Sequence, residues 1–275
     1  MGLGRIRQPR WERALVTGAS AGIGREMAVH LAAAGVDLVL VARSGDRLEE
    51  LAAELRAGKA DLEVEVLAAD LSDPAELAVV EKRVGAGEAP IDLLVNNAGL
   101  GYEGPFHSQD ASEVWETIGV NVVALVRLTH AALRTMVERG RGHVVLVSSM
   151  ASLQGMPMTA VYSATKAFIT SFGEAVYEEL KGTDVVVTTV LPGLTRTEFH
   201  ERGRWNLDKW PSVGWQDADE VAAETLAAAV RSRPEVVTGR INRIFAVLSG
   251  IPPRRIRRTL IGRAARRAWP DRNSP

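Results

Sequence analysis

Tyr162 and Lys166 are the pair of side chains best suited to proton transfer in this sequence. They stand four residues apart in a predicted helix, so both lie on one face of it. A free tyrosine has a pKa of about 10, and a neighbouring ammonium group lowers it by favouring the phenolate. Ser149 ends a predicted strand 13 residues before Tyr162, where its hydroxyl can orient a substrate carbonyl. These residues predict acid–base chemistry at a carbonyl or alcohol group.

A second Tyr-x-x-x-Lys pair, Tyr177 and Lys181, provides an internal comparison. It falls 15 residues farther along the same predicted helix, about 22 Å along its axis and away from the edge where ligands bind. The residue 13 positions before Tyr177 is Ala164, which has no hydroxyl. We therefore interpret Tyr177 as structural.

Alternating strands and helices must position these side chains. Apolar runs typical of strands occur at 14–17, 36–42, 62–69, 91–95, 143–147, 185–191 and 236–237. Helical patterns separate them at 23–34, 48–55, from Pro74 onward, and at 121–137, 159–180 and 217–229. We expect an α/β fold, a single Rossmann-like domain with a doubly wound parallel sheet of about seven strands. Ligands of such a sheet bind beyond the carboxyl ends of its strands.

Composition and charge narrow the class of protein. With 46% hydrophobic and 24% charged residues, the chain is expected to be globular. It has no cysteine, which excludes disulfides and thiolate metal sites and fits a cytoplasmic location. No apolar run approaches the ~18 residues typical of a membrane span. The net charge is −1, yet residues 240–275 hold ten arginines and one acid, a formal charge of +9. We therefore expect a catalytic domain at 1–240 and a basic C-terminal helical extension at 241–275.

A glycine-rich turn, TGASAGIG at 17–24, joins the first predicted strand to the first predicted helix. Glycines allow the backbone to approach a diphosphate, and the helix N-terminus offers N–H donors and positive potential. The turn predicts a dinucleotide site made of Gly18, Ser20, Ala21, Gly22, Ile23 and Gly24. The alternative is a turn that only packs helix against strand.

The end of the second predicted strand indicates which cofactor binds. An NAD-preferring site places Asp or Glu there, whereas this chain has Ala42 and then Arg43. Arg43 suits a 2′-phosphate, so NADP(H) is the expected cofactor and NAD(H) the alternative. A solvated charge at Arg43 and a simple helix start at Asp70 are the competing interpretations. The adenosine side is expected to rest on Asp70, Leu71, Asn97, Ala98 and Gly99.

Over about residues 10–240, the chain resembles the short-chain dehydrogenase/reductase family. The matching motifs, in family order and spacing, are TGASAGIG at 17–24, Asp70-Leu71, NNAG at 96–99, Asn121, Ser149, Tyr162 with Lys166, and Pro192-Gly193 followed by Thr195 and Thr197. One departure is Ala21, where many NADP-dependent members carry a second basic residue.

The resemblance implies a role for each matching residue. Tyr162 is the implied general acid/base, Lys166 lowers its pKa and binds the nicotinamide ribose, and Ser149 holds the substrate oxygen. Asn121 is implied to kink its helix and anchor a water that relays protons to Lys166. Implied contacts to the cofactor's carboxamide and diphosphate come from Pro192, Gly193, Thr195 and Thr197. No metal is required.

The substrate site is expected to be apolar. In the family the region at about 195–216 forms a substrate lid, and here it holds Phe199, Trp205, Trp210 and Trp215. We take Met156 and Trp205 as substrate-binding candidates beside Ser149 and Tyr162, although both also suit packing. The other candidates are Leu100, Tyr102, Phe106, Leu153, Pro157 and Met158.

Residues 252–268 predict a basic amphipathic helix. Ile256, Leu260, Ile261, Ala264 and Ala268 fall near one face, with arginines around it. The alternatives for this helix are peripheral contact with an anionic membrane surface, contact with an acidic partner or a phosphorylated substrate, packing on a sister subunit, and simple packing with solvated arginines. By analogy with the family we expect a homo-dimer or homo-tetramer, and no nucleic acid partner.

Two functional hypotheses follow. The first is an NADPH-dependent oxidoreductase that reduces a lipophilic ketone or aldehyde, or catalyses the reverse reaction. The second is a non-catalytic NADP(H)-binding sensor or scaffold that acts through its basic tail. The presence of Asn121, Ser149, Tyr162 and Lys166 together favours the enzyme.

Overall fold

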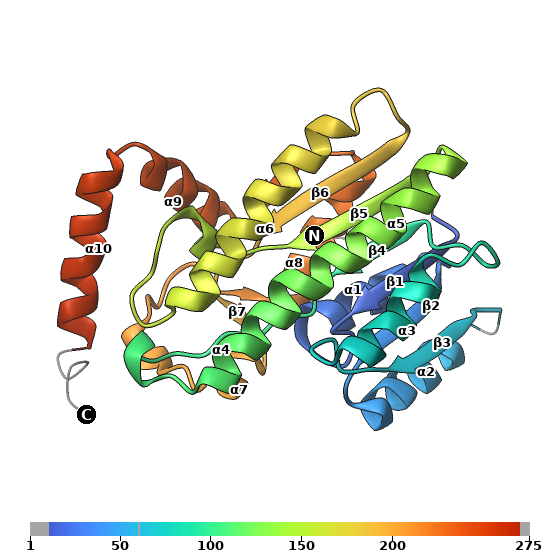
Figure 1. Cartoon of the computed structure of the whole chain (residues 1–275), viewed down its shortest axis with the longest axis horizontal. Helices are drawn as coiled ribbons and strands as arrows, with labels where there is room; N and C mark the ends of the chain where they lie inside the picture. Colours follow the sequence, from blue (N-terminus) through green and yellow to red (C-terminus); the bar gives the residue numbers. More distant parts are fainter. Residues whose placement is uncertain (1–10, 60, 270–275) are drawn as a thin grey trace.

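The computed structural model describes residues 11–59 and 61–269. Their centre is a seven-stranded parallel sheet in the order β3-β2-β1-β4-β5-β6-β9 (Figure 1). The strands are β1 (Arg13–Thr17), β2 (Asp37–Ala42), β3 (Val64–Ala68), β4 (Leu93–Asn96), β5 (Gly142–Val147), β6 (Val185–Leu191) and β9 (Glu235–Val237). The predicted single Rossmann-like domain with a doubly wound parallel sheet is confirmed.

Helices cover both faces of the sheet because successive strand residues point to opposite sides. Leu15 of β1 belongs to one apolar cluster, while its neighbours Ala14 and Val16 belong to the other. One face carries α1 (Gly22–Ala33), α2 (Gly45–Gly58) and α8 (Ala218–Val230). The opposite face carries α3 (Pro74–Val84), α5 (Leu125–Arg139) and α6 (Ala160–Glu179). The two layers leave the carboxyl ends of the strands at one edge.

The helix predicted at 121–137 is longer and less regular in the structure. It begins with α4 (Ala111–Ile118), passes through the π-helical segment η2 (Gly119–Ala124), and continues as α5. The joined helix Ala111–Arg139 is long and apolar enough to cross a membrane by length and composition alone, which the search for continuous apolar runs missed. Its α5 part buries Leu125, Leu128, Ala132 and Met136 in the cluster that lies against the sheet. That is the position of a core helix.

The segment expected to form a lid is bracketed by two short strands. β7 (Thr195–Arg196) pairs with β8 (Gln216–Asp217) in a separate parallel ladder. Between them lie the one-turn helix α7 (Phe199–Arg202) and the 3-10 turn η4 (Leu207–Lys209). Two further 3-10 turns, η1 (Phe106–Ser108) and η3 (Met150–Leu153), follow β4 and β5.

The basic tail forms two helices, α9 (Arg240–Gly250) and α10 (Arg254–Ala268). Figure 1 shows both at the end of the molecule remote from β3, with α10 standing apart from the sheet. The predicted amphipathic face of α10 does not pack inward as one surface: Ile256 and Leu260 are exposed, whereas Ala265 is buried. The helix instead turns Ala265 and Trp269 toward the body of the protein.

Candidate active site

A cavity of about 1110 Å³ lies at the carboxyl ends of the strands. The sequence-predicted residues that line it are Gly18, Ser20, Ala21, Gly22, Ile23, Arg43, Asp70, Leu71, Asn97, Ala98, Gly99, Ser149, Met156, Tyr162, Lys166, Pro192, Gly193, Thr195, Thr197 and Trp205. The fold thus brings together residues from most of the chain. Within residues 11–59 and 61–269, no three His, Asp or Glu side chains gather closely enough to hold a metal ion.

Tyr162, Ser149 and Lys166 meet in the middle of this cavity. Ser149 lies between β5 and η3, and its Oγ accepts a hydrogen bond from the Ala151 N–H at 3.1 Å. Lys166 is buried one helical turn after Tyr162; its Nζ donates to the Val147 carbonyl at 2.8 Å and lies 5.7 Å from the centre of the Tyr162 ring. The neighbouring strand end and helix turn therefore place a hydroxyl, a phenol and an amine around one space.

The expected lowering of the Tyr162 pKa is not found in this structure. Burial raises the pKa of Tyr162 to about 12, and a hydrogen bond with the Ser149 side chain offsets only part of that rise. Burial also lowers the pKa of Lys166 to about 8, since the ammonium loses its hydration in the same enclosed space. The expectation was wrong because it counted the charge on Lys166 and not the desolvation of both groups. In this arrangement Tyr162 is protonated at neutral pH and can act as a proton donor.

Asn121 lies inside the π-helical segment η2 and is fully buried. Its Nδ2 donates to the Leu100 carbonyl at 2.8 Å and to Thr165 Oγ1 at 3.0 Å, while its Oδ1 accepts from the Leu100 N–H at 2.8 Å. The side chain thereby ties the loop after β4 to helix α6. It does not line the cavity, but a Cβ placed on Gly99 would be 3.4 Å from both Asn121 Oδ1 and Lys166 Nζ. Asn121 and Lys166 therefore face the same narrow space beside Gly99.

The glycine turn brings the N-terminus of α1 to the cavity. The residue before the helix is Ala21, whose side chain cannot cap the first N–H groups, and Gly22 and Ile23 of the first turn line the cavity. Gly24 was expected at the cofactor and does not line the cavity. A Cβ at Gly24 would collide with the Gly18 carbonyl and the Asn97 amide, so this glycine allows α1 to pack closely on the turn.

Arg43 stands at one end of the cavity with half of its side chain exposed. Its Nη1 lies 2.8 Å from Glu116 Oε1 and 3.9 Å from Asp70 Oδ2. Asp70 also accepts hydrogen bonds from the Ser72 N–H and hydroxyl at 2.8 and 2.7 Å, just before α3 begins. Asp70 therefore lies in the cavity wall and holds the turn before α3, whereas the residue that caps this helix is Asp73, which accepts hydrogen bonds from the Ala75 and Glu76 N–H groups.

Arg47 is a second cation in this wall that the sequence search missed. It falls four residues after Arg43 in the first turn of α2, a spacing that would have indicated the same side of the site. Its Nη1 donates to Glu198 Oε2 at 2.8 Å, and Arg202 contacts the same oxygen at 2.6 Å. Hydrogen bonds from these two arginines lower the pKa of Glu198. Arg47 thus lines the same cavity as Ala21.

Aromatic side chains form the other end of the cavity. The Tyr162 ring centre lies 5.5 Å from that of Phe199 and 5.6 Å from that of Trp205. Trp205 Nε1 donates to the Gly101 carbonyl at 2.8 Å, which holds the indole against the loop after β4. Among the remaining candidates, the lining residues are Leu100, Tyr102, Leu153, Phe199 and Trp210.

Four substrate candidates lie outside this lining: Phe106, Pro157, Met158 and Trp215. Phe106 is 61% exposed in η1. Trp215 packs instead against His200. His200 lines the cavity and was missed, and burial lowers its pKa, so it is neutral at pH 7.

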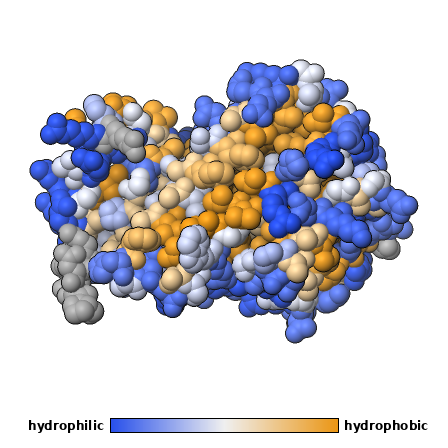
Figure 2. All heavy atoms as spheres, viewed as in Figure 1, coloured by the Kyte–Doolittle hydropathy of each residue, from blue (hydrophilic) through white to orange (hydrophobic). Residues whose placement is uncertain are grey.

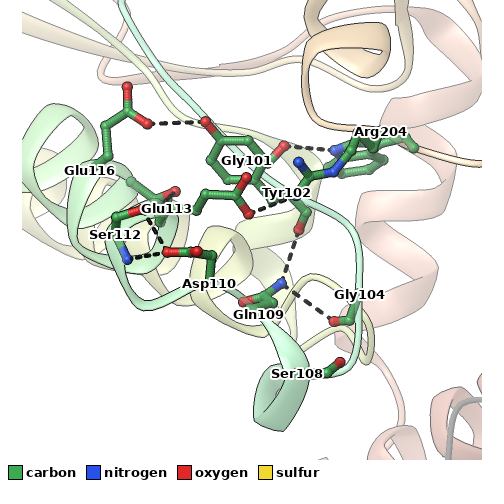
Figure 3. A network of polar contacts seen from close by, with 12 residues as sticks. Gly101, Tyr102, Gly104, Ser108, Gln109, Asp110, Ser112, Glu113, Glu116 and Arg204 are labelled. Atoms are coloured by element: carbon green, nitrogen blue, oxygen red, sulfur yellow. Dashed lines mark hydrogen bonds and ion pairs between the residues drawn. The ribbon is translucent and has the colours of Figure 1, made fainter. Parts of the chain in front are cut away.

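Tyr102 lies in a polar network that connects the loop after β4 with α4 and with Arg204 (Figure 3). Its hydroxyl donates to Glu116 Oε2 at 3.0 Å, and the other oxygen of that carboxylate holds Arg43. The Arg204 guanidinium lies 5.3 Å from the Tyr102 ring centre and donates to Glu113 at 2.6 Å. Burial, followed by the bond to Glu116, raises the pKa of Tyr102. Glu116 is therefore shared between the Arg43 end and the loop beside Tyr162.

Tyr177 lies outside the cavity, as its structural interpretation requires. Its ring packs against the apolar cluster on the α5–α6 side of the sheet. Lys181 lies 5.8 Å from the ring centre and pairs with Glu178 at 2.5 Å on the surface.

The sequence was compared with known proteins. A family model described as short chain dehydrogenase matches residues 12–207. A protein of Rattus norvegicus named very-long-chain 3-oxoacyl-CoA reductase is 32% identical over 242 residues, 86% of this chain and 75% of the relative. The Homo sapiens protein of the same name is 32% identical over 202 residues, 72% of this chain and 64% of the relative. The matched part of the chain thus spans about two thirds to three quarters of these relatives.

Solved structures agree over nearly the whole fold. A short-chain dehydrogenase from Sphingobium yanoikuyae in complex with NADPH is 35% identical, with a TM-score of 0.79, and the match covers 91% of this chain and 95% of that one. The bulky-bulky ketone specific alcohol dehydrogenase from Comamonas testosteroni is 30% identical, with a TM-score of 0.75 and coverages of 88% and 94%.

Proposed function

Because the chain belongs to the short-chain dehydrogenase family and is an oxidoreductase of that family, we propose that it interconverts a bulky lipophilic ketone or aldehyde and its alcohol, with NADP(H) as the preferred cofactor. The observation that carries the proposal is the placement of Tyr162, Ser149 and Lys166 around one space, directly beside the aromatic end of the cavity. A partly apolar wall next to a proton donor suits reduction of a lipophilic carbonyl.

The chain's own residues supply the proton and hold the reacting oxygen. When bound, the nicotinamide cofactor supplies or accepts the hydride. In the reductive direction, Ser149 and Tyr162 donate hydrogen bonds to the carbonyl oxygen, and Tyr162 transfers its phenolic proton to that oxygen as charge develops. The resulting phenolate is stabilised by the nearby Lys166 ammonium. Asn121 faces Lys166 beside Gly99. We assign to Asn121 the positioning of the water that relays a proton to Lys166.

The cavity suits a dinucleotide phosphate. Backbone N–H groups at the start of α1 face the space where a diphosphate would lie, and the helix dipole favours an anion there. Arg43 and Arg47 supply two cations for a 2′-phosphate. The NADPH complex of the Sphingobium relative supports the same assignment. Pro192, Gly193, Thr195 and Thr197 would contact the nicotinamide and diphosphate side.

The aromatic end of the cavity supports a bulky apolar substrate. Phe199, Trp205 and Trp210 surround the space next to Tyr162, and Met156 completes the wall from the loop before α6. The names of the rat relative and of the Comamonas relative, a very-long-chain acyl reductase and a bulky-ketone dehydrogenase, point the same way. We assign the segment between β7 and β8 as the substrate lid.

An exposed apolar face supports a homo-dimer or homo-tetramer. Trp115 of α4, Val123 of η2, Val137 of α5 and Phe168 of α6 are all exposed on the outer helices of the sheet. Figure 2 shows apolar side chains gathered across this side of the molecule. A surface of this kind is typical of contacts between protein subunits.

The test is NADPH oxidation measured with a graded panel of carbonyl compounds, from short aldehydes to long-chain 3-oxoacyl esters, aromatic ketones and steroids. Wild-type protein is expected to reduce at least one bulky member, and Tyr162→Phe is expected to bind NADPH while losing turnover by orders of magnitude. Tyr177→Phe is the matched control and should retain turnover. Equal turnover in Tyr162→Phe and wild type would reject the mechanism.

A further inference from the structure

Helix α9 exposes most of its apolar side chains, together with Arg240 and Arg243, and buries Asn242. Ile244 and Leu248 are 59% and 53% exposed, whereas Asn242 on the opposite side is only 6% exposed. The other exposed apolar side chains of this helix and its end are Ile241, Phe245, Val247 and Ile251. Helices on the surface of a water-soluble domain normally turn their apolar side chains toward the core. Contact with an apolar medium would account for it.

Helix α10 adds cations to the same end of the molecule. Ile256 and Leu260 are exposed and share a helix face with Arg263 and Arg267 by their spacing of four, seven and eleven residues. Among the described residues no carboxylate pairs with Arg263 or Arg267, whereas Arg243 of α9 pairs with Glu224. The Arg257 guanidinium donates to the Ser249 carbonyl at 2.9 Å, which fixes the start of α10 to the end of α9.

We infer that α9 and α10, residues 240–268, dock on the surface of an anionic phospholipid bilayer. The exposed aliphatic side chains would enter the boundary between headgroups and acyl chains, while the unpaired arginines meet lipid phosphates. Each cation near such a surface adds attraction that decreases with salt. The two helices supply both components, apolar area and positive charge, on neighbouring elements.

A second copy of the chain fits this surface less well. In a two-fold contact each residue meets the same patch of its partner, so Arg263 and Arg267 would approach their own equivalents. Like charges placed opposite one another oppose such an interface. The exposed face around Trp115 and Phe168 offers apolar area for self-association outside the arginine-rich helices. A nucleic acid would use the arginines but leave the aliphatic face of α9 without a role.

The docking surface is continuous with the cavity. Phe245 and Ser249 of α9 line the cavity wall, together with Trp210 of the segment between β7 and β8. Trp269 follows α10, lies 5.8 Å from Trp210 by ring centres, and donates to Glu103, as Trp210 does. If the proposed function holds, a lipophilic substrate dissolved in the bilayer would reach the cavity beside α9 without crossing bulk water. The docking itself does not depend on that function.

The test is flotation of the full-length protein with vesicles of phosphatidylcholine alone and of phosphatidylcholine mixed with phosphatidylglycerol. Wild type is expected to float with the mixed vesicles, and less as salt is raised. The Ile244→Ser/Leu248→Ser and Arg263→Glu/Arg267→Glu variants should each bind about tenfold more weakly or worse. Val79→Ser, which removes an exposed apolar side chain on α3, is the matched control and should bind as wild type does.

Failure of wild type to bind, or binding by both double variants as tight as that of wild type, would overturn the inference. The inference would also be overturned if wild type left the vesicles unbound and the Ile244→Ser/Leu248→Ser variant formed a smaller assembly than wild type in light scattering. That result would identify a second copy of the chain as the occupant. Turnover of a short, water-soluble carbonyl and circular dichroism are measured on every variant. Loss of vesicle binding with intact turnover then separates this inference from the proposed function.

Discussion

The Arg43 guanidinium lies 2.8 Å from the Glu116 carboxylate. The cation proposed to bind the 2′-phosphate is therefore paired with an acid before any cofactor arrives. The same carboxylate accepts the Tyr102 hydroxyl, so both its oxygens are engaged. A phosphate bound at Arg43 would have to compete with Glu116 and would be repelled by its charge.

Glu116→Gln is expected to tighten NADPH binding. The amide still reaches Arg43 and Tyr102 but no longer repels a phosphate. Arg43 is half exposed and solvent screens the pair, so the gain should be about two- to fivefold in KM for NADPH, with little change for NADH. Unchanged ratios of the two KM values would show that Glu116 does not affect cofactor choice.

Arg43→Ala and Arg47→Ala are each expected to raise the KM for NADPH by about tenfold or more and to leave NADH nearly unaffected, because a charge-assisted bond to phosphate is lost. The double variant should bind the two cofactors about equally. Parallel weakening of NADH and NADPH would instead indicate a structural effect on α2, and the steady-state constants for both cofactors decide between these outcomes.

Burial of Lys166 should make stability depend on pH. Its pKa is about 8 in the folded protein and 10.5 in an exposed lysine, so between these values the unfolded chain binds more protons. Since stability rises with pH wherever the unfolded state holds more protons, the free energy of unfolding should increase across this window, by about 3 kcal/mol at most. Urea unfolding at several pH values measures the slope. In Lys166→Met the slope from this residue should disappear; a slope as steep as in wild type would assign it to other groups.

Gly101→Ala is expected to lower turnover while NADPH binding persists. A Cβ at this position would be 2.5 Å from Tyr162 Cδ2 and 3.1 Å from Phe199 Cζ, so the phenol must shift. A displacement of about 1 Å at a catalytic group can cost about a hundredfold in rate. Gly155→Ala is the control, since nothing lies within 4 Å of a Cβ there. If both variants retain full turnover, the position of Tyr162 is less constrained than the packing indicates.

The sequence predicted the sheet and the centre of the site because both follow from local patterns and one rule of topology. Ser149, Asn97 and Pro192 each follow a parallel strand, and such strands end at one edge, so their meeting required no tertiary information. Gly101 and His200 were missed because their importance depends on which ring packs against them. The α9 face was missed for a similar reason: an apolar stripe indicates a helix but not which way that helix turns.

The wrong prediction for the pKa of Tyr162 has the same origin. The spacing of Tyr162 and Lys166 predicts their proximity, but the degree of desolvation depends on Phe199 and Trp205, which come from a distant segment. Arg47 is the opposite case. Its spacing of four residues from Arg43, within the first turn of α2, is a signal that the sequence itself contains.

The ladder between β7 and β8 has a mechanical consequence. Thr195 pairs with Gln216 and Arg196 with Asp217, so the two ends of the intervening segment are fastened to each other. Closing the segment at its base limits the conformations that the residues between the two strands can adopt. Because Phe199 and Trp205 lie in this segment and also contact each other, any displacement of it would change the packing of both rings against Tyr162 at once.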